Sequence, residues 1–361
     1  MHPRQLAIST PGRICLFGEH QDYLGLPVIA AAISRRVTIE GTIREDNRMV
    51  LSLPDVGSEI SFTLDGKLAY SEERDYFRGC VNVLRKHGHQ FSRGYDCIVR
   101  GNIPINAGTS SSSALVVSWL HFLSAISDGR TLLTPEEIGT VAYEAEVLEF
   151  SEPGGMMDQY STAIGGLIFL ESHPKISIKY LDGSLGSFVL GNSRQSKDTK
   201  SILARVRGEV SDAATALRRI YPEFSFHKTS LAQLESFAKH ITSRQYELLE
   251  ATIVNRNLTF EARDLLMQNT VDHAKIGALL NIHQDRLRDA LGISTPTIDS
   301  MIQKALEAGA LGAKINGSGG GGCMFAYAPE NAEEVAEAVG QTGEAMVITI
   351  DEGTRRERAD E

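Results

Sequence analysis

The amino-acid sequence predicts an α+β protein with two domains. Domains usually contain about 100 to 200 residues, and the chain has 361. Short segments rich in β-branched residues fill its first third, and long segments with helical periodicity follow from about Gly191. This change predicts a boundary near residue 185, with one domain over residues 1–185 and a second over residues 186–361.

The amino-terminal half is predicted to contain strands with helices between them. Near-alternation of apolar and polar residues predicts the strands, and Thr134, followed by a proline and two glutamates, marks a helix start. The expected strands cover residues 28–33, 37–43, 49–53, 60–64, 95–100, 164–171 and 176–180. The expected helices cover residues 76–86, 114–127 and 134–150.

The carboxyl-terminal half is predicted to be mostly helical. Apolar residues recur there at helical spacing. The expected helices cover residues 201–219, 231–238, 243–267, 271–292, 297–308 and 332–339. Strands are expected only at residues 323–328 and 345–351, and the charged tail from Gly353 is expected to fray.

Composition and charge exclude several classes of protein. The net charge of −10 disfavours broad binding to nucleic acid or to anionic membranes, so any phosphate-bearing ligand needs a local site. We expect no secretion signal and no membrane span, because no apolar stretch is long enough. The four cysteines are scattered without the spacing of a zinc or redox site. A cytoplasmic protein with reduced thiols is therefore expected.

The first candidate motif lies near the amino terminus. Arg13, Glu19, His20 and Asp22 occur within ten residues around Gly18. Carboxylates and an imidazole can bind the hydroxyls of a polyol, and an arginine can hold a phosphate. A solvent-exposed loop with a local salt bridge accounts for the same spacing about equally well, so this motif alone decides nothing.

The second motif is a loop of small residues, 104–114, that opens a helix. It contains Gly108 and four consecutive serines. The free N–H groups at a helix start attract anions, and a serine hydroxyl can bind Mg²⁺. The loop lacks the Gly-Lys-Ser/Thr of a Walker motif. A flexible serine loop with an ordinary helix cap is the alternative.

The third motif pairs two acidic residues, Glu146 and Asp158. Mg²⁺ prefers oxygen ligands, and activation of a hydroxyl group needs a positioned carboxylate, so the two acids could divide these roles. Glu144, Glu149 and Glu152 lie nearby, so an acidic helix face is the simpler explanation for Glu146. Glycines and a glutamine frame Asp158, which makes it the sharper candidate.

The fourth motif is a glycine run at residues 317–322, where five of the six residues are glycine. Glycine at this density costs chain entropy and is kept where the backbone turns tightly or approaches a ligand. A floppy linker is the weaker explanation, because a strand is predicted directly afterwards.

In this order and spacing the four motifs resemble those of the GHMP kinases, and the first resembles the galactokinase signature Gly-Arg-x-x-x-x-Gly-Glu-His-x-Asp-Tyr. The resemblance implies an α+β, two-domain GHMP kinase-like fold. Its amino-terminal domain would resemble domain 2 of ribosomal protein S5, and its carboxyl-terminal domain would be ferredoxin-like. It also implies ATP- and Mg²⁺-dependent phosphorylation of a monosaccharide at the anomeric hydroxyl, with galactose as the leading substrate.

The resemblance implies a role for each matching residue. Asp158 would be the base or orienting carboxylate, Arg13 would neutralise charge beside it, and Ser112 and Glu146 would hold Mg²⁺. The sugar would be bound by Glu19, His20, Asp22, Tyr23, Gly155 and Asp158. The nucleotide would be bound by Asn106, Ala107, Gly108, Thr109, Ser110, Ser111, Ser112, Gly317, Gly319 and Gly320.

Departures from the galactokinase signature at Cys15 and Gln21, and from the family's second motif at Thr109, make kinase activity better supported than galactose specificity. A heptose, fucose or uronic acid kinase is one alternative, and a sugar- and ATP-binding regulator without turnover is another. Lys197 and Lys200 could reach an anionic group, although lysines are more often exposed to solvent. The expected partner is a small sugar, with no nucleic acid or membrane, and the protein is expected to be a monomer or weak homo-oligomer.

Overall fold

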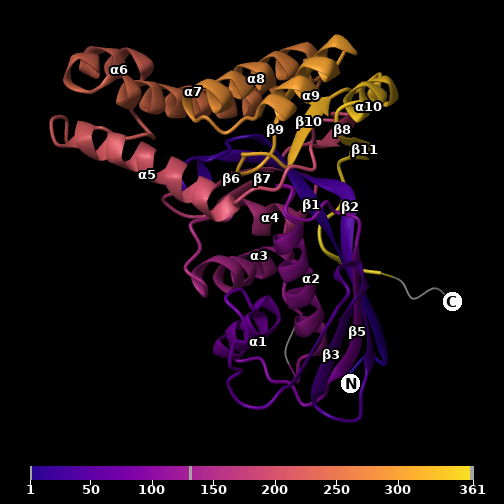
Figure 1. Cartoon of the computed structure of the whole chain (residues 1–361). Coiled ribbons are helices and arrows are strands. Elements are labelled where there is room, and N and C mark those ends of the chain that lie inside the picture. Colours follow the sequence, from indigo (N-terminus) through magenta and orange to yellow (C-terminus); the bar gives the residue numbers. More distant parts are fainter. Residues whose placement is uncertain (1, 130–131, 358–361) are drawn as a thin grey trace.

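The computed structural model describes residues 2–129 and 132–357, which form two sheet-based units stacked on one another (Figure 1). The first unit, lower in Figure 1, contains a long twisted sheet with helices against it. The second unit, above it, contains a smaller sheet under a layer of helices. In the described ranges no helix is both long and apolar enough to cross a membrane.

The first sheet has eight strands, with β12-β1-β2-β5-β3-β4 as its main path and β6 and β7 continuing from β2. Neighbouring strands are antiparallel except β3 and β5, which are parallel. The strands are β1 (Gln5–Phe17), β2 (Val28–Ile43), β3 (Arg48–Leu53), β4 (Ser58–Thr63), β5 (Tyr95–Gly101), β6 (Leu167–Glu171), β7 (Ser177–Tyr180) and β12 (Arg355–Arg356).

The helices α2 (Ser111–Ile126) and α4 (Met157–Ile164) pack on this sheet. The helix α1 (Tyr76–Lys86) packs on α2, and α3 (Pro135–Tyr143) packs on α2 and α4. α2 lies at the centre and is buried on nearly all sides, as its run of apolar residues requires. Thr134 and Glu137 form a reciprocal capping box that starts α3. A π-helical turn, Glu144–Leu148, continues α3 and carries Glu146.

The second sheet has the antiparallel order β11-β8-β10-β9. Its strands are β8 (Ser187–Asn192), β9 (Gly312–Ile315), β10 (Cys323–Tyr327) and β11 (Glu344–Thr349). Numbered along the chain this order is 4-1-3-2, the ferredoxin-like arrangement. The helices of this unit are α5 (Thr199–Arg218), α6 (Leu231–Phe237), α7 (Ser243–Leu266), α8 (His273–Asp285), α9 (Pro296–Glu307) and α10 (Ala332–Gly340). The predicted α+β architecture, with a second unit of ferredoxin-like strand order, is confirmed.

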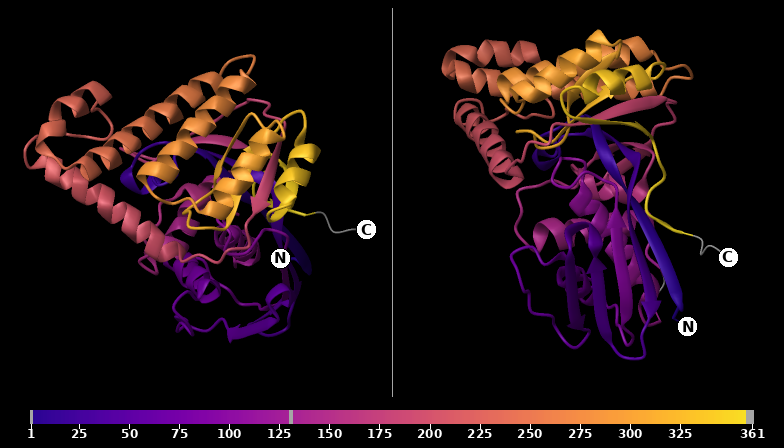
Figure 2. Two further views of the ribbon diagram at one scale, coloured as in Figure 1. Left: turned by 45° about the horizontal axis from the view of Figure 1, so that its top comes forward. Right: turned by 45° about the vertical axis from the view of Figure 1, so that its right-hand side comes forward.

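A shared core joins the two units. Phe17 and Ile29 from the first sheet pack in one apolar cluster with Phe188 and Phe325 from the second. Figure 2 shows the helices α7 to α9 spread above this junction. Because interiors pack densely and resist compression, this cluster fixes how the two units face each other.

The chain passes from the first sheet to the second between β7 and β8, and we keep the division at residue 185 as a proposal. Residues near 350–356 return to the first unit. Ile350 bridges to Ile33, β12 pairs with β1, and Arg36 donates to Asp351 Oδ2 over 2.8 Å. The prediction that the tail frays from Gly353 is therefore wrong as far as residue 357, and residues 358–361 lie outside the described residues.

Several elements differ from the predicted ones. The two strands predicted at residues 28–33 and 37–43 are one strand, β2, and β1, β8, β9 and α4 were not predicted. Each missed segment is short or rich in small and polar residues, so pairing and packing across the sheets decide its conformation rather than local propensity. The helix predicted at residues 134–150 ends its regular part at Tyr143 and turns through the π-helical segment.

Candidate active site

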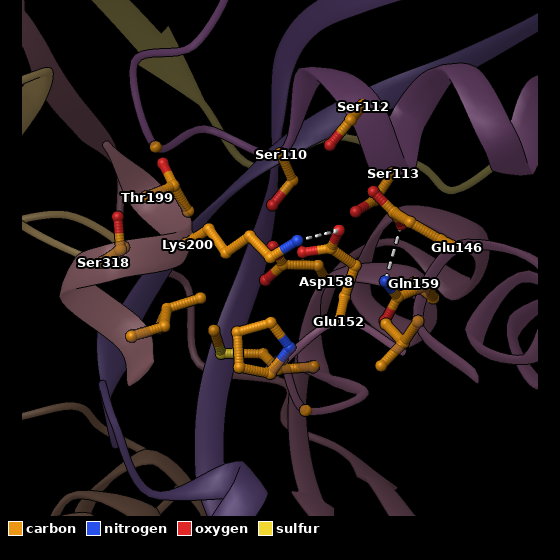
Figure 3. A pocket seen from close by; sticks show the side chains of 18 of the residues that line it. Ser110, Ser112, Ser113, Glu146, Glu152, Asp158, Gln159, Thr199, Lys200 and Ser318 are labelled. Carbon is orange, nitrogen blue, oxygen red and sulfur yellow. Dashed lines mark hydrogen bonds and ion pairs between the residues drawn. The ribbon is translucent and has the colours of Figure 1, made fainter. Parts of the chain in front are cut away.

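A cavity of about 410 Å³ lies between the two units and draws its walls from both. Figure 3 shows Asp158 near its centre. Ser112, Ser113 and Glu146 lie on one side, and Thr199 and Ser318 lie on the other. The predicted motifs, which span three hundred residues of sequence, therefore converge on one cavity.

Arg13 and Asp158 form the central ion pair. Arg13 lies on β1 and is 3% exposed. Its Nε donates to Asp158 Oδ1 over 2.8 Å, its Nη2 pairs with the same oxygen at 2.7 Å, and its Nη1 donates to the Gly108 carbonyl over 2.5 Å. The Asp158 side chain is 32% exposed, so part of the carboxylate faces the cavity while the arginine holds it in place.

The serine loop, residues 106–113, keeps hydrogen-bonding groups free. Asn106, Gly108 and Ser110 have φ values of 54°, 87° and 59°, a left-handed conformation that turns the backbone sharply into α2. The Ser110 side chain does not cap α2. Its buried Oγ has no hydrogen-bond partner among the described residues. An anion at this helix start would satisfy the unpaired groups.

Glu146 lies beside the serine loop. Its Oε2 accepts from Gln159 over 2.6 Å. Burial raises the pKa of Glu146, and hydrogen bonds from Ser113, Gln159 and Ser112 oppose that shift. A carboxylate and a serine hydroxyl are the oxygen ligands that suit Mg²⁺. The described part of the chain has no group of three or more His, Cys, Asp or Glu able to hold a metal.

His20, Asp22 and Tyr23 line another part of the cavity. His20 Nδ1 lies 2.9 Å from the Tyr23 hydroxyl, and its Nε2 lies 3.0 Å from the Ser318 carbonyl oxygen. Burial lowers the pKa of His20 to about 4, so the imidazole is neutral at pH 7. We call the residues His20, Asp22 and Tyr23 the acceptor end of the cavity.

The side chain of Asp22 contacts the first turn of α4. Its Oδ2 accepts from the Met157 N–H over 3.2 Å and its Oδ1 from the Tyr23 N–H over 2.9 Å. Burial and the charge of Asp158 raise the pKa of Asp22 to about 6. A Cβ atom on Gly155 would lie 2.0 Å from Asp22 Oδ2, so only glycine leaves room for this carboxylate.

Glu19 lies in a buried charged cluster beneath the acceptor end. It pairs with Lys314 of β9, which is fully buried and also donates to the Cys15 carbonyl over 3.0 Å. The second carboxylate oxygen of Glu19 has no hydrogen bond among the described residues and lies 3.8 Å from His283 Nδ1. The contact of Glu19 with a sugar stays a prediction. Lys314 already binds Glu19, so a sugar hydroxyl would compete with Lys314 for this carboxylate.

The predicted nucleotide residues separate into two groups. Asn106, Gly108, Ser110, Ser111, Ser112 and Gly317 line the cavity. Ala107, Thr109, Gly319 and Gly320 do not. A Cβ atom on Gly319 would meet Ile293 at 2.5 Å, and one on Gly320 would meet Ile202 at 2.2 Å, so these glycines allow close packing within the second unit.

Sequence reasoning missed the placement of two lysines. Lys197, expected in solvent, lines the cavity and donates to Ser318 Oγ over 3.0 Å. Lys314 was not singled out, although a lone lysine between apolar residues just before a strand could have drawn attention to it. Lys200 also lines the cavity (Figure 3), but it is 47% exposed and pairs with Glu73 over 3.0 Å and with Glu152 over 3.8 Å.

Three regions of the chain match known protein families. Residues 2–42 match the galactokinase galactose-binding signature. Residues 75–166 match the GHMP kinases N terminal domain, and residues 263–345 match GHMP kinases C terminal. These regions contain most of the residues that line the cavity.

Individual relatives divide between two substrates. A mevalonate kinase from Thermococcus sibiricus is 30% identical over 357 residues, with 94% of each chain covered. A galactokinase from Mannheimia succiniciproducens is 25% identical, covering 93% of this chain and 88% of its own. The crystal structure of Lactococcus lactis galactokinase complexed with galactose superimposes with a TM-score of 0.84 at 24% identity, covering 97% of this chain and 95% of that one.

The fold, the four motifs and the similarity to these kinases over nearly the whole length of the chain all indicate the same family. The relatives are all kinases of one family, and they differ in the substrate that each name gives. The chain belongs to the GHMP kinase family.

Proposed function

We propose that the protein transfers the terminal phosphoryl group of ATP, with Mg²⁺, to the anomeric hydroxyl of a monosaccharide, with galactose as the leading substrate. The observation that carries this proposal is that two carboxylates, Asp22 and Asp158, line the same cavity as the serine loop. Carboxylates accept hydrogen bonds from hydroxyl groups, and an open helix start binds phosphate.

The nucleotide would lie against the serine loop. The start of α2 would bind the phosphates through its N–H groups and the Ser110 hydroxyl. Ser112 and Glu146 would hold Mg²⁺, which neutralises phosphate charge when bound. This placement leaves the terminal phosphate directed toward Asp158, because Gly108 of the loop and Asp158 both bind Arg13.

Asp158 would accept a hydrogen bond from the attacking hydroxyl. Arg13 occupies Oδ1, and the exposed part of the carboxylate faces the cavity. Phosphoryl transfer depends mainly on positioning and on electrostatic stabilisation, so fixing this carboxylate beside the acceptor is the contribution that the chain itself makes.

Mevalonate is the second candidate, and the similarity to the Thermococcus sibiricus enzyme favours it. Mevalonate carries a carboxylate, which requires a positive partner at the acceptor end. Arg207 lies over the Tyr23 ring, 5.6 Å from its centroid, but Asp22 brings negative charge to that end, and His20 is neutral at pH 7. A neutral polyol fits these groups better than a carboxylic acid, and the galactose-binding signature over residues 2–42 agrees.

An ADP-release assay over a panel of acceptors tests the proposal. The panel contains galactose, other hexoses, fucose, a heptose, a uronic acid and mevalonate, each with Mg²⁺ and ATP. Galactose or a close relative should give the highest kcat/KM. Asp158→Asn should reduce turnover by about 10² to 10⁴, the usual contribution of a positioned acid or base, while nucleotide binding remains measurable by calorimetry.

Two results would overturn the proposal. A kcat/KM for mevalonate far above that of every sugar would make this a mevalonate kinase. No turnover with any acceptor, while calorimetry still detects both ATP and sugar binding, would make it a regulator that binds without catalysis.

A further inference from the structure

Four cationic side chains among the described residues line the cavity: Arg13, Arg74, Lys197 and Lys200. Arg74 and Lys200 pair with Glu152, and Lys200 also pairs with Glu73. Arg13 and Lys197 are the two that lie against Gly108 of the serine loop, and they differ in how their nitrogen atoms are used. Arg13 is buried; its Nε donates to Asp158, its Nη1 donates to the Gly108 carbonyl, and its Nη2 forms an ion pair with Asp158. A guanidinium with these bonds fixes the Asp158 carboxylate and the serine loop relative to each other. It still has N–H groups on Nη1 and Nη2, but each of its three nitrogen atoms already faces a protein oxygen.

Lys197 is the second cation. It lies in the segment between β8 and α5 and reaches from the second unit to the serine loop of the first. A Cβ atom placed on Gly108 would lie 2.7 Å from Lys197 Nζ, so the ammonium group lies directly over the backbone of that loop. A side chain at position 108 would push the ammonium away.

The ammonium group of Lys197 has unpaired hydrogen-bond donors in the described structure. It has three donors, and among residues 2–129 and 132–357 it makes one hydrogen bond, to Ser318 Oγ. Burial and the charge of Arg13 lower its pKa to about 8, while Cys323 and Asp158 act in the opposite direction. An anion between Lys197 and the start of α2 would fill the free donors and offset both unfavourable effects.

We propose that Lys197 binds the terminal phosphoryl group of ATP and stabilises its charge during transfer, so that the second unit completes the phosphate site of the first. The proposal rests on the proposed function in taking ATP as the phosphoryl donor. In the transfer, the bond from phosphorus to the bridging oxygen breaks, and a bond to the acceptor oxygen forms. The acceptor proton passes to Asp158, and ADP leaves. Lys197 donates hydrogen bonds throughout and transfers no proton.

Calorimetry on the full chain isolates this contact from the identity of the acceptor. Mg²⁺-ADP lacks the terminal phosphoryl group, and a Mg²⁺ complex of the non-hydrolysable imido analogue of ATP has one. Lys197→Met should weaken analogue binding about tenfold or more and leave ADP binding within threefold. Lys197→Arg should restore most of the analogue affinity. Lys275→Met is the matched control, because Lys275 is exposed on α8 and pairs with Glu261.

Kinetics with any acceptor found active give the second measurement. Lys197→Met should lower kcat by about 10² to 10³, as the loss of one transition-state donor does, and change the KM for the acceptor little. A rise in the KM for the acceptor with an unchanged ratio of analogue to ADP affinity would overturn the proposal, because Lys197 would then bind an anionic group on the acceptor. An unchanged ratio together with unchanged kcat would overturn it as well.

The two proposals fail in different ways. If no sugar is phosphorylated but Lys197→Met selectively weakens analogue binding, the role of Lys197 stands and sugar kinase activity does not. If galactose is phosphorylated and Lys197→Met behaves like wild type, the opposite holds. If wild-type protein binds neither nucleotide, the role of Lys197 is wrong. A thermal melt of both Lys197 variants checks that they are folded.

Discussion

Two loops with glycines meet at the cavity, and they use glycine for different purposes. The serine loop, residues 106–113, keeps polar groups free toward the cavity. The glycine loop, residues 316–322, uses its polar groups inside the protein. Gly320 N–H donates to the Ile293 carbonyl over 2.7 Å, Gly322 N–H donates to Gln195, and Asn316 Nδ2 donates to Gly108.

The glycine loop therefore supports the serine loop more than it contacts a ligand. Asn316 is fully buried and binds the Gly108 carbonyl on one side and the Cys15 N–H on the other. Directly after the loop, Cys323 N–H donates to the Ala107 carbonyl over 2.7 Å. Glycine density by itself does not identify a ligand loop, because what matters is whether the backbone donors are already bound.

The largest effect is expected at the supporting loop. Gly322 has a φ of 72°, and a Cβ atom there would lie 2.5 Å from the Ala107 carbonyl oxygen. Gly322→Ala should lower the free energy of unfolding by about 3 kcal/mol, from the left-handed backbone and the displaced neighbour together. Urea denaturation measures this.

A helical glycine provides the control for that experiment. Gly208 lies inside α5, and no atom would lie within 4 Å of its added Cβ. Gly208→Ala should raise stability by about 0.5 to 1 kcal/mol. If Gly322→Ala has the stability of wild type but loses nucleotide binding, the glycine loop contacts the ligand directly and the contrast between the two loops is wrong.

An intermediate effect, on binding rather than folding, is expected at the serine loop. Ser110→Ala removes a buried hydroxyl that has no hydrogen-bond partner among the described residues, so the unliganded protein should be no less stable. ATP affinity should fall about 30-fold, because a hydrogen bond to a charged group contributes about 2 kcal/mol. Isothermal calorimetry measures the affinity.

Ser118 is the matched control on the same helix. Its Oγ donates to the Ile8 carbonyl over 3.3 Å, away from the cavity. Ser118→Ala should therefore cost about 1 kcal/mol of stability and leave ATP affinity unchanged. Equal loss of ATP affinity in both variants would show that the serine loop is not distinguished from the rest of α2.

The smallest effect concerns pH, to which neither loop contributes a titratable side chain. Asp22 has a pKa of about 6 against an ordinary 3.8, because burial and Asp158 disfavour its charge. Folding therefore favours the protonated acid, and this contribution is complete below about pH 4 and is lost as the pH rises through 6. Asp22→Asn removes the titration.

The unfolding free energy of wild type minus that of Asp22→Asn should fall by about 1 kcal/mol between pH 4 and pH 7.5, a value reduced for partial exposure of the side chain. Denaturation of both proteins across this range measures it. A difference that stays constant with pH would place the titration on another group. A difference that rises with pH would mean that Asp22 is stabilised as a carboxylate.

Local patterns predicted the helices well. The predicted helix at residues 76–86 has the bounds of α1, and capping signals placed the start of α3. β8 was missed, although it is a central strand of the second sheet. Only a few apolar residues mark it in sequence, and its conformation depends on pairing with β10 on one side and β11 on the other.

The motifs predicted which residues face the cavity better than what each residue does there. The ion pair between Arg13 and Asp158 was anticipated as a pair of neighbouring charges. The partner of Glu19 was not, because Lys314 is 295 residues away and only the meeting of the two units brings it there. The same holds for Lys197, whose position depends on where β8 ends relative to the serine loop.

The return of residues 350–356 to the first sheet sets an order on biosynthesis. β1, which carries Arg13, gains β12 as a second neighbour at Ile8 and Ser9 only after residue 356 has left the ribosome. Until then Arg36 lacks the Gly353 carbonyl, to which it donates over 2.7 Å, and β1 is an open edge that other chains can pair with. Expression of residues 1–185 alone would make that exposed edge permanent.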